Sequence, residues 1–188
     1  MEFILFGRGN GVKRTIRDNY HQNYALIGED KDTVINYLEA LKVVNPDVSG
    51  NQETYTEYVN GNDVKVMNLT FYNGVMSGFE YEYHNLNSAY EFASYLREEL
   101  EMTFGEKDTY PEMLHKNKDS FDNVKNVSEL KNQYTYYEDW TMYFEGDEQE
   151  NIDKMLDGRD CSRIDMRFEL SVIDENKAIV SVKYIVVP

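Results

Sequence analysis

Apolar and polar residues alternate along three segments of the C-terminal half, and this period of two residues predicts three β-strands. The clearest alternation runs over 163–172, where the even-numbered residues are apolar and the odd-numbered ones are polar. The segment 134–144 alternates in a similar way, but Glu138 interrupts its apolar face. Residues 178–187 are apolar on both faces at most positions, so we expect this strand to be central in its sheet.

A β-hairpin is predicted in the first half of the chain. Residues 64–72 and 75–83 both have strand character, and Asn73-Gly74 between them is a dipeptide that strongly favours a two-residue turn. Such a turn places Lys65 opposite Glu82, and the opposite charges of this pair support the register. Both faces of the hairpin are partly apolar, so we expect both to be at least partly covered.

Two amphipathic helices are predicted from apolar residues spaced three and four positions apart. The first covers 31–44, and either Asp30 or Asp32 caps its start. The second runs from a capping box at 88–91 to Gly105, which closes it. Each helix has one apolar stripe, so each is expected to pack on the sheet.

Two further strands are predicted at 3–6 and 53–59. The polar segment 106–132 forms a long connection, with a short helix near 124–130. The fold class is therefore α+β: a mainly antiparallel sheet of about six to seven strands with two main helices packed on one face.

One helix followed by three strands occurs twice along the chain, at 31–83 and at 88–187. This order suggests an αβββ pseudo-repeat, although no repeat is visible residue by residue. We expect one domain over 1–188, with halves at 1–84 and 85–188.

The charge is distributed unevenly along the chain. The formal net charge is −16, but residues 1–28 hold four bases and two acids, so the other 160 residues hold −18. Residues 138–160 alone hold nine acids and two bases. This charge exceeds the roughly 2–8 that keeps a small domain soluble. The field that it creates would therefore be available to a basic partner.

The composition excludes several classes of function. Negative charge disfavours direct binding to nucleic acid and to anionic membranes. No apolar run is long enough for a signal peptide or a membrane span, so we expect a cytoplasmic protein. The single cysteine, Cys161, excludes an internal disulfide, and the three histidines lack metal-ligand spacing. We predict no cofactor and no metal site, and the oligomeric state is left open.

We predict a contact surface for a basic protein, formed by the acidic run and by surplus tyrosines. Tyrosine is favoured at interfaces because its ring is apolar and its hydroxyl is polar. The predicted partner-binding residues are Asp147, Glu148, Glu150, Asp153, Asp157, Glu80, Glu82, Tyr136, Tyr137 and Tyr143. The alternative is that the acids form a solvated face and the tyrosines are only good strand formers.

A glycine-rich loop at 7–11 follows the first predicted strand, as phosphate-binding loops do. Its predicted phosphate-binding residues are Gly9, Gly11, Lys13 and Arg14. The spacing matches neither the dinucleotide-binding fingerprint nor a Walker A loop, so a flexible turn is the alternative.

Glu138 and Cys161 are candidates for chemistry outside these segments. A carboxylate buried at position 138 would have a raised pKa and could act as a general acid or base. We favour a β-bulge that turns this side chain outward. Cys161 lies between Arg159 and Arg163, but neighbouring acids offset their effect on the thiol.

The leading hypothesis is a small binding protein, not an enzyme, whose acidic and tyrosine-bearing surface docks on a basic partner. An inhibitor, an immunity protein or a nucleic-acid mimic would fit this description. The alternative is a small-molecule-binding or enzymatic domain with its pocket between the sheet and the helices. A subunit of a structural oligomer is the third hypothesis.

Overall fold

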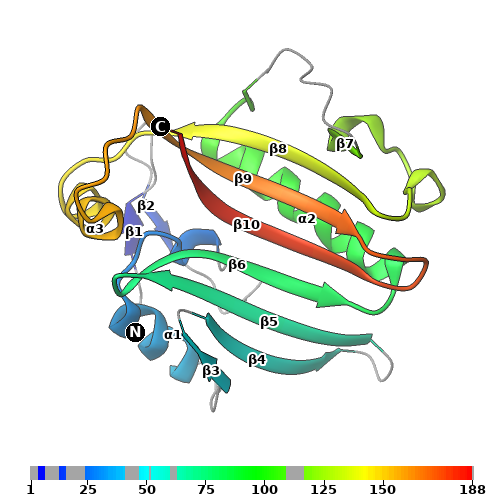
Figure 1. Ribbon diagram of the computed structural model, residues 1–188, viewed down its shortest axis with the longest axis horizontal. Coiled ribbons are helices and arrows are strands. Elements are labelled where there is room, and N and C mark those ends of the chain that lie inside the picture. Colours follow the sequence, from blue (N-terminus) through cyan, green and yellow to red (C-terminus); the bar gives the residue numbers. More distant parts are fainter. Residues whose placement is uncertain are drawn as a thin grey trace.

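The protein is built on one large β-sheet, seen in a computed structural model that describes residues 4–6, 13–15, 24–40, 47–50, 52–59, 63–108 and 117–187 (Figure 1). The strand order is β3-β4-β5-β6-β10-β9-β8-β7. The strands are β3 (Asp47–Ser49), β4 (Gln52–Val59), β5 (Asp63–Tyr72), β6 (Val75–Tyr83), β7 (Lys118–Ser120), β8 (Tyr134–Met142), β9 (Arg163–Val172) and β10 (Ala178–Val187). A separate two-stranded sheet pairs β1 (Ile4–Phe6) with β2 (Lys13–Thr15).

The predicted α+β class is confirmed, but the prediction of a mainly antiparallel sheet is wrong because the sheet is mixed. Six long strands form its body, and a strand of three residues flanks them at each edge. The edge strand β7 runs parallel to β8. It lies in the polar connection, where three residues without apolar alternation carry no strand signal. The central position of β10, between β6 and β9, is as predicted.

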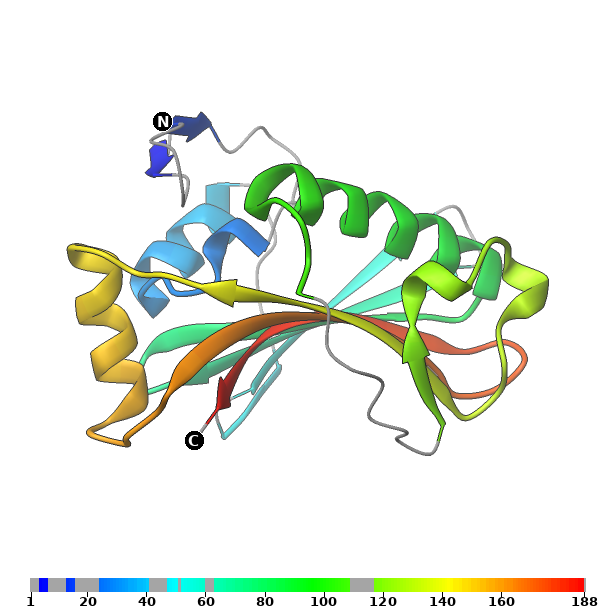
Figure 2. The same cartoon turned by 90° about the horizontal axis from the view of Figure 1, so that it is seen from above.

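Among the described residues, three α-helices accompany the sheet: α1 (Lys31–Ala40), α2 (Leu86–Phe104) and α3 (Asp147–Leu156). Two short 3₁₀ helices, η2 (Phe121–Asn123) and η3 (Val127–Glu129), stand where one short helix near 124–130 was predicted. Figure 2 shows α1 and α2 on the same face of the sheet, as predicted, whereas α3 lies at one end of it.

The helix boundaries follow from side-chain caps. Asp30 Oδ1 accepts a hydrogen bond from the Thr33 amide at 3.0 Å, which caps α1 and lowers the pKa of Asp30. The predicted capping box at Ser88 is wrong by one turn, because Asn85 caps α2 by accepting from the Ser88 amide at 3.2 Å. Gly105, with a φ of 85°, ends α2 as predicted.

The predicted hairpin forms, but its register changes partway along. The turn residues Asn73 and Gly74 both have positive φ, at 48° and 76°. A β-bulge then shifts the pairing between Thr70 and Phe71, so Lys65 lies opposite Tyr83 and not opposite Glu82 as predicted. The bulge turns the aromatic residues of β6 toward α2, where Tyr81 makes an edge contact with a helix side chain.

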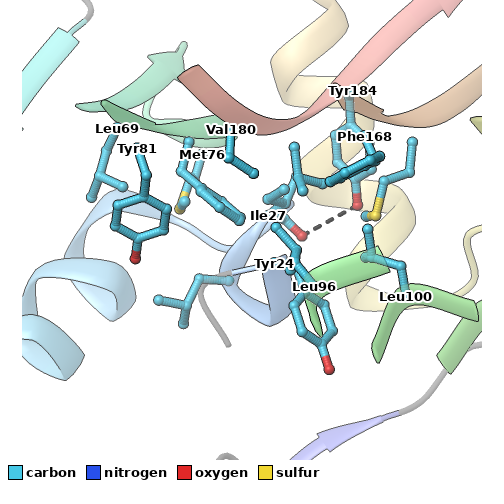
Figure 3. Packing of buried hydrophobic residues seen from close by; sticks show 14 of the residues in the cluster. Tyr24, Ile27, Leu69, Met76, Tyr81, Leu96, Leu100, Phe168, Val180 and Tyr184 are labelled. Carbon is cyan, nitrogen blue, oxygen red and sulfur yellow. Dashed lines mark hydrogen bonds between the residues drawn. The ribbon is translucent and has the colours of Figure 1, made fainter. Parts of the chain in front are cut away.

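The hydrophobic core lies between the sheet and the two helices on its face (Figure 3). Leu96 and Leu100 of α2 are fully buried in the same cluster as Phe168 and Val180 of the central strands. Where β6 and β10 diverge, the segment 24–30 closes the gap through backbone hydrogen bonds such as Met76 N to Glu29 O at 2.9 Å. The sheet face toward these helices is therefore filled by side chains.

The predicted pseudo-repeat is not confirmed. The strands of both halves do run from edge to centre in chain order, β3 to β6 and β7 to β10. However, α1 has 10 residues and α2 has 19, and α3 has no counterpart in the first half among the described residues. The halves 1–84 and 85–188 stay a prediction.

Candidate functional site

The helix α3 forms inside the acidic run, where the sequence predicted only an acidic surface. Its residues Ile152, Met155 and Leu156 are buried at helical spacing and anchor it to the core. Asn73 of the β5–β6 turn donates from Nδ2 to the carbonyl oxygen of Lys154 at 3.2 Å. The helix is thus fixed to one end of the sheet, with its other side exposed (Figures 1 and 2).

The exposed side of α3 and the residues that flank the helix carry a group of acidic side chains. We call this set, together with Tyr143, the α3 acidic surface. Its acids are Glu145, Asp147, Glu148, Glu150, Asp153, Asp157 and Asp160. All are exposed except the half-buried Glu148, and the side chain of Tyr143 is 79% exposed.

The two bases of this region are exposed, but their charged ends contact the protein's own backbone. Arg159 donates from Nε to the Leu156 carbonyl oxygen at 2.9 Å and from Nη2 to Met155, so it caps the C-terminal end of α3. The ammonium of Lys154 lies beside Gly74 in the β5–β6 turn. Glu148 apart, no acid of the α3 acidic surface has an ion pair with a residue that the structure describes.

The helix dipole explains only part of this charge. Asp147, Glu148 and Glu150 lie in the first turn, where negative charge stabilises a helix. Asp153 lies toward the other end, and Asp157 is the C-cap itself with a φ of 52°. Negative charge is unfavourable there, and this left-handed backbone conformation favours glycine or asparagine. The helix dipole therefore does not account for the acids at the C-terminal end, although Asp153 accepts a hydrogen bond from Gln149, one turn earlier in the helix, at 2.7 Å.

The two predicted acids of β6 do not join the α3 acidic surface. β6 begins beside α3 at Val75, and Glu82 lies roughly 24 Å further along the strand. Glu82 is paired with Lys177 at 2.9 Å and with His84 at 2.7 Å. Burial opposes its ionisation, but these hydrogen bonds and charges lower the pKa of Glu82. Glu80 is half-buried on the same sheet face.

The three predicted tyrosines also lie in different places and differ in their exposure to solvent. Tyr136 is 2% exposed, so its place on the predicted contact surface is wrong. Its hydroxyl donates to the Glu129 carbonyl oxygen, and burial raises the pKa of Tyr136. Tyr137 is half-buried on the opposite face of β8, with the Arg167 guanidinium 4.9 Å from its ring centre. Only Tyr143, of these three, is exposed next to α3.

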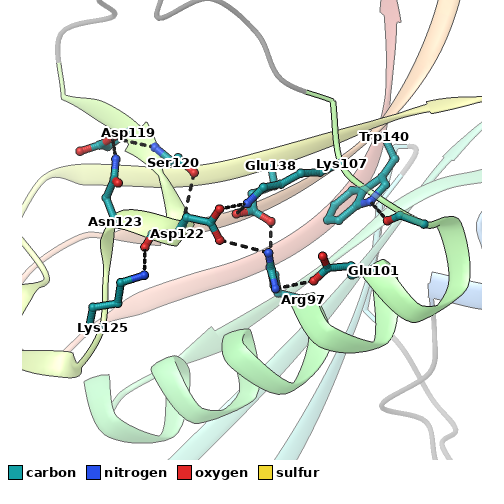
Figure 4. Close-up of polar contacts among 11 residues, drawn as sticks. Arg97, Glu101, Lys107, Asp119, Ser120, Asp122, Asn123, Lys125, Glu138 and Trp140 are labelled. Carbon is teal, nitrogen blue, oxygen red and sulfur yellow. Dashed lines mark hydrogen bonds and ion pairs between the residues drawn. The ribbon is translucent and has the colours of Figure 1, made fainter.

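Glu138 is buried against the helix-facing side of the sheet, and the predicted outward bulge is wrong. It keeps the regular register of β8 opposite Phe168, and its side chain is 1% exposed. Figure 4 shows two cations at its carboxylate: Arg97 Nε at 3.0 Å and Lys107 Nζ at 2.5 Å. A charge can be buried there because both of its oxygens accept hydrogen bonds from cations.

The same cations also contact other acids, which makes a network across four elements. Arg97 pairs with Glu101 at 2.5 Å and with Asp122 at 3.0 Å, and Lys107 contacts Asp122. Burial opposes the charge on Arg97, but its acidic partners, Glu138 first, raise its pKa. The hydrogen bond from Lys107 lowers the pKa of Asp122. Because Glu138 is fully engaged, this network is an anchor and not a general acid or base awaiting a substrate.

The remaining candidates either lie outside the described residues or form no grouped site within them. Gly9 and Gly11 lie outside the described residues, as do the side chains of Lys13 and Arg14 on β2. Within the described chain no three His, Cys, Asp or Glu side chains are grouped as metal ligands. One shallow polar hollow lies at the β9–β10 turn, at the far end of β6 from α3. It is lined by His84, Asn132, Asp174, Glu175, Asn176 and Lys177.

No protein-family model, curated protein or solved structure matches this chain. Over the described residues, every helix is too short or too polar to cross a membrane.

Proposed function

We propose that this chain is a protein-binding module whose α3 acidic surface docks on a basic protein. The observation that carries the proposal is the charge of α3: acids occupy even its C-terminal end, where they oppose the helix dipole. Negative charge that the helix dipole does not favour needs another reason for its presence, and recognition of a basic partner supplies one.

The arrangement of the surface supports this proposal. The α3 acidic surface lies at one end of the molecule, and its fully exposed carboxylates make no ion pair with a described residue. Such a field accelerates encounter with a basic partner. Tyr143, at the entry to the helix, offers an aromatic side chain that a partner can desolvate.

The partner class follows from the same chemistry. A row of exposed carboxylates presents negative charge as a phosphate backbone does, so proteins built to bind nucleic acid carry a complementary basic surface. We therefore propose an inhibitor, an immunity protein or a nucleic-acid mimic that acts on a basic nucleic-acid enzyme. The module itself would need no catalytic residue.

The test is binding to a panel of basic nucleases and other basic nucleic-acid enzymes, measured at low and at high salt. The variant replaces Asp147, Glu148, Glu150 and Asp153 by their amides. With a true partner, the variant should bind at least about tenfold more weakly at low salt, and the difference should shrink as salt rises.

The matched control removes the same charge elsewhere. It replaces the four exposed acids Glu91, Glu98, Glu106 and Glu175 by Gln, all of them outside the α3 acidic surface. The control should lose less than about threefold in affinity. Equal losses in both variants, or no salt-dependent complex with any member of the panel, would overturn the proposal.

A further inference from the structure

Residues 117–133, which we call the strap, cover the helix-facing side of β8 and β9 next to α2. The strap contains β7, η2 and η3. Two of its side chains, Phe121 and Val124, are buried, and the other fifteen are exposed or half-buried. A segment with so few buried apolar contacts has low local stability compared with a core strand.

The two buried side chains fix the middle of the strap. The Phe121 ring packs edge-on against Phe168 of β9, with ring centres 5.3 Å apart, and lies 5.9 Å from Tyr90 of α2. The hydroxyl of Tyr90 donates to the carbonyl oxygen of Val124 at 3.4 Å. This part of the strap therefore depends on one aromatic cluster between α2 and β9.

The charge network fixes the strap beside that cluster (Figure 4). Asp122 follows Phe121 directly, and its carboxylate binds Arg97 of α2 and Lys107. The same two cations hold the buried carboxylate of Glu138. The strap is thus tied to the helix and to the sheet through one shared set of ion pairs.

The ends of the strap have weaker attachments to β8. At one end, β7 pairs with β8 over three residues. At the other, the Lys131 amide donates to the Tyr136 hydroxyl at 3.1 Å. The rest of the sheet is held by much longer ladders, such as the ten residue pairs between β9 and β10.

We infer that the strap is a latched segment that opens as one unit while the sheet stays folded. Its latch is the network of Arg97, Lys107, Asp122 and Glu138, together with the Phe121 contact. Opening uncovers Phe168 and gives solvent access to Glu138, both buried when the strap is closed. This conformational device is independent of the proposed function of α3, which lies at the opposite end of β8.

Amide hydrogen exchange with mass spectrometry on the whole chain tests the inference. In the wild type, the hydrogen-bonded amides of the strap should exchange together, at least about tenfold faster than those of β9 and β10. Lys107→Met should accelerate the strap amides by about a further tenfold, because it removes an ion pair that only the closed strap makes. Phe121→Leu should accelerate the same set of amides.

The matched control is Lys183→Met, which breaks the Lys183–Glu169 ion pair on the opposite face of the sheet. It should not accelerate the strap. Three results would overturn the inference: equal wild-type rates in the strap and in β9, no acceleration of the strap in Lys107→Met, or acceleration of the strap and β9 by the same factor in Lys183→Met.

Discussion

Arg97 of α2 donates from Nε to Oε2 of Glu138 on β8 at 3.0 Å, and this pair joins the helix to the sheet through an otherwise apolar interface. We expect Arg97→Met to destabilise the protein by about 3–5 kcal/mol, because it leaves a buried carboxylate with one cation fewer. Chemical denaturation at pH 7 measures this loss.

The double variant Arg97→Met with Glu138→Leu should be more stable than Arg97→Met alone, since it also removes the buried charge that Lys107 alone would otherwise pair. Lys177→Met, which breaks the more exposed pair with Glu82, should cost less than about 1 kcal/mol. If Arg97→Met were no less stable than the Lys177→Met control, the buried charge of Glu138 would not depend on Arg97.

Acid should destabilise the folded protein. The pKa values of Asp30, Asp122 and Glu82 are all lowered in the folded state. A carboxyl with a lowered folded pKa adds stability that is present above its unfolded pKa and is lost as pH falls through the folded one. Stability should therefore be full above about pH 5 and fall below about pH 4.

Asp122→Asn isolates one of these groups. The variant should be less stable than the wild type at pH 7, and the difference should shrink as pH falls through the lowered folded pKa of Asp122, where the wild-type carboxyl also becomes protonated. Urea denaturation over this pH range measures it. A difference that stays constant with pH would mean that the charge of Asp122 contributes nothing.

Asp157 should lower the stability of the protein and contribute to its binding to a basic partner. Its φ of 52° and its place at the C-terminal end of α3 are both unfavourable to aspartate. Asp157→Gly should therefore stabilise the protein by roughly 0.5–1 kcal/mol and weaken binding to a basic partner. Gln133→Gly is the matched control, because Gln133 also has a positive φ but lies outside the α3 acidic surface. Gln133→Gly should stabilise the protein without changing its affinity for the partner. If Asp157→Gly also leaves this affinity unchanged, Asp157 is not part of the binding site.

Much of the sheet could be predicted because its signals are local. Strict alternation gave 163–172 the same bounds as β9, and Asn73-Gly74 placed the β5–β6 turn correctly. The register beyond the turn was predicted wrongly, although Gly78 lies at the register shift and a glycine inside a strand often marks a bulge or a close backbone approach. β7 was missed because its three residues show no apolar alternation, and only their pairing with β8 identifies them as a strand.

The candidate site was predicted in part. The acidic run indicated a charged surface at α3. The buried stripe of Ile152, Met155 and Leu156, which makes this segment a helix, was missed because acidic residues surround it. Glu138 was noticed as a polar residue on an apolar face. Its partners Arg97 and Lys107 lie 41 and 31 residues away in the chain, and sequence alone does not show such a meeting.

The most direct test of the α3 proposal is a hydrogen-exchange footprint of the chain in complex with a basic enzyme found in the binding panel. We expect the partner to slow exchange in peptides covering 143–160 and to leave those covering 80–84 and 174–177 unchanged. Protection confined to 80–84 or 174–177, with α3 exchanging as in the free protein, would contradict the proposal.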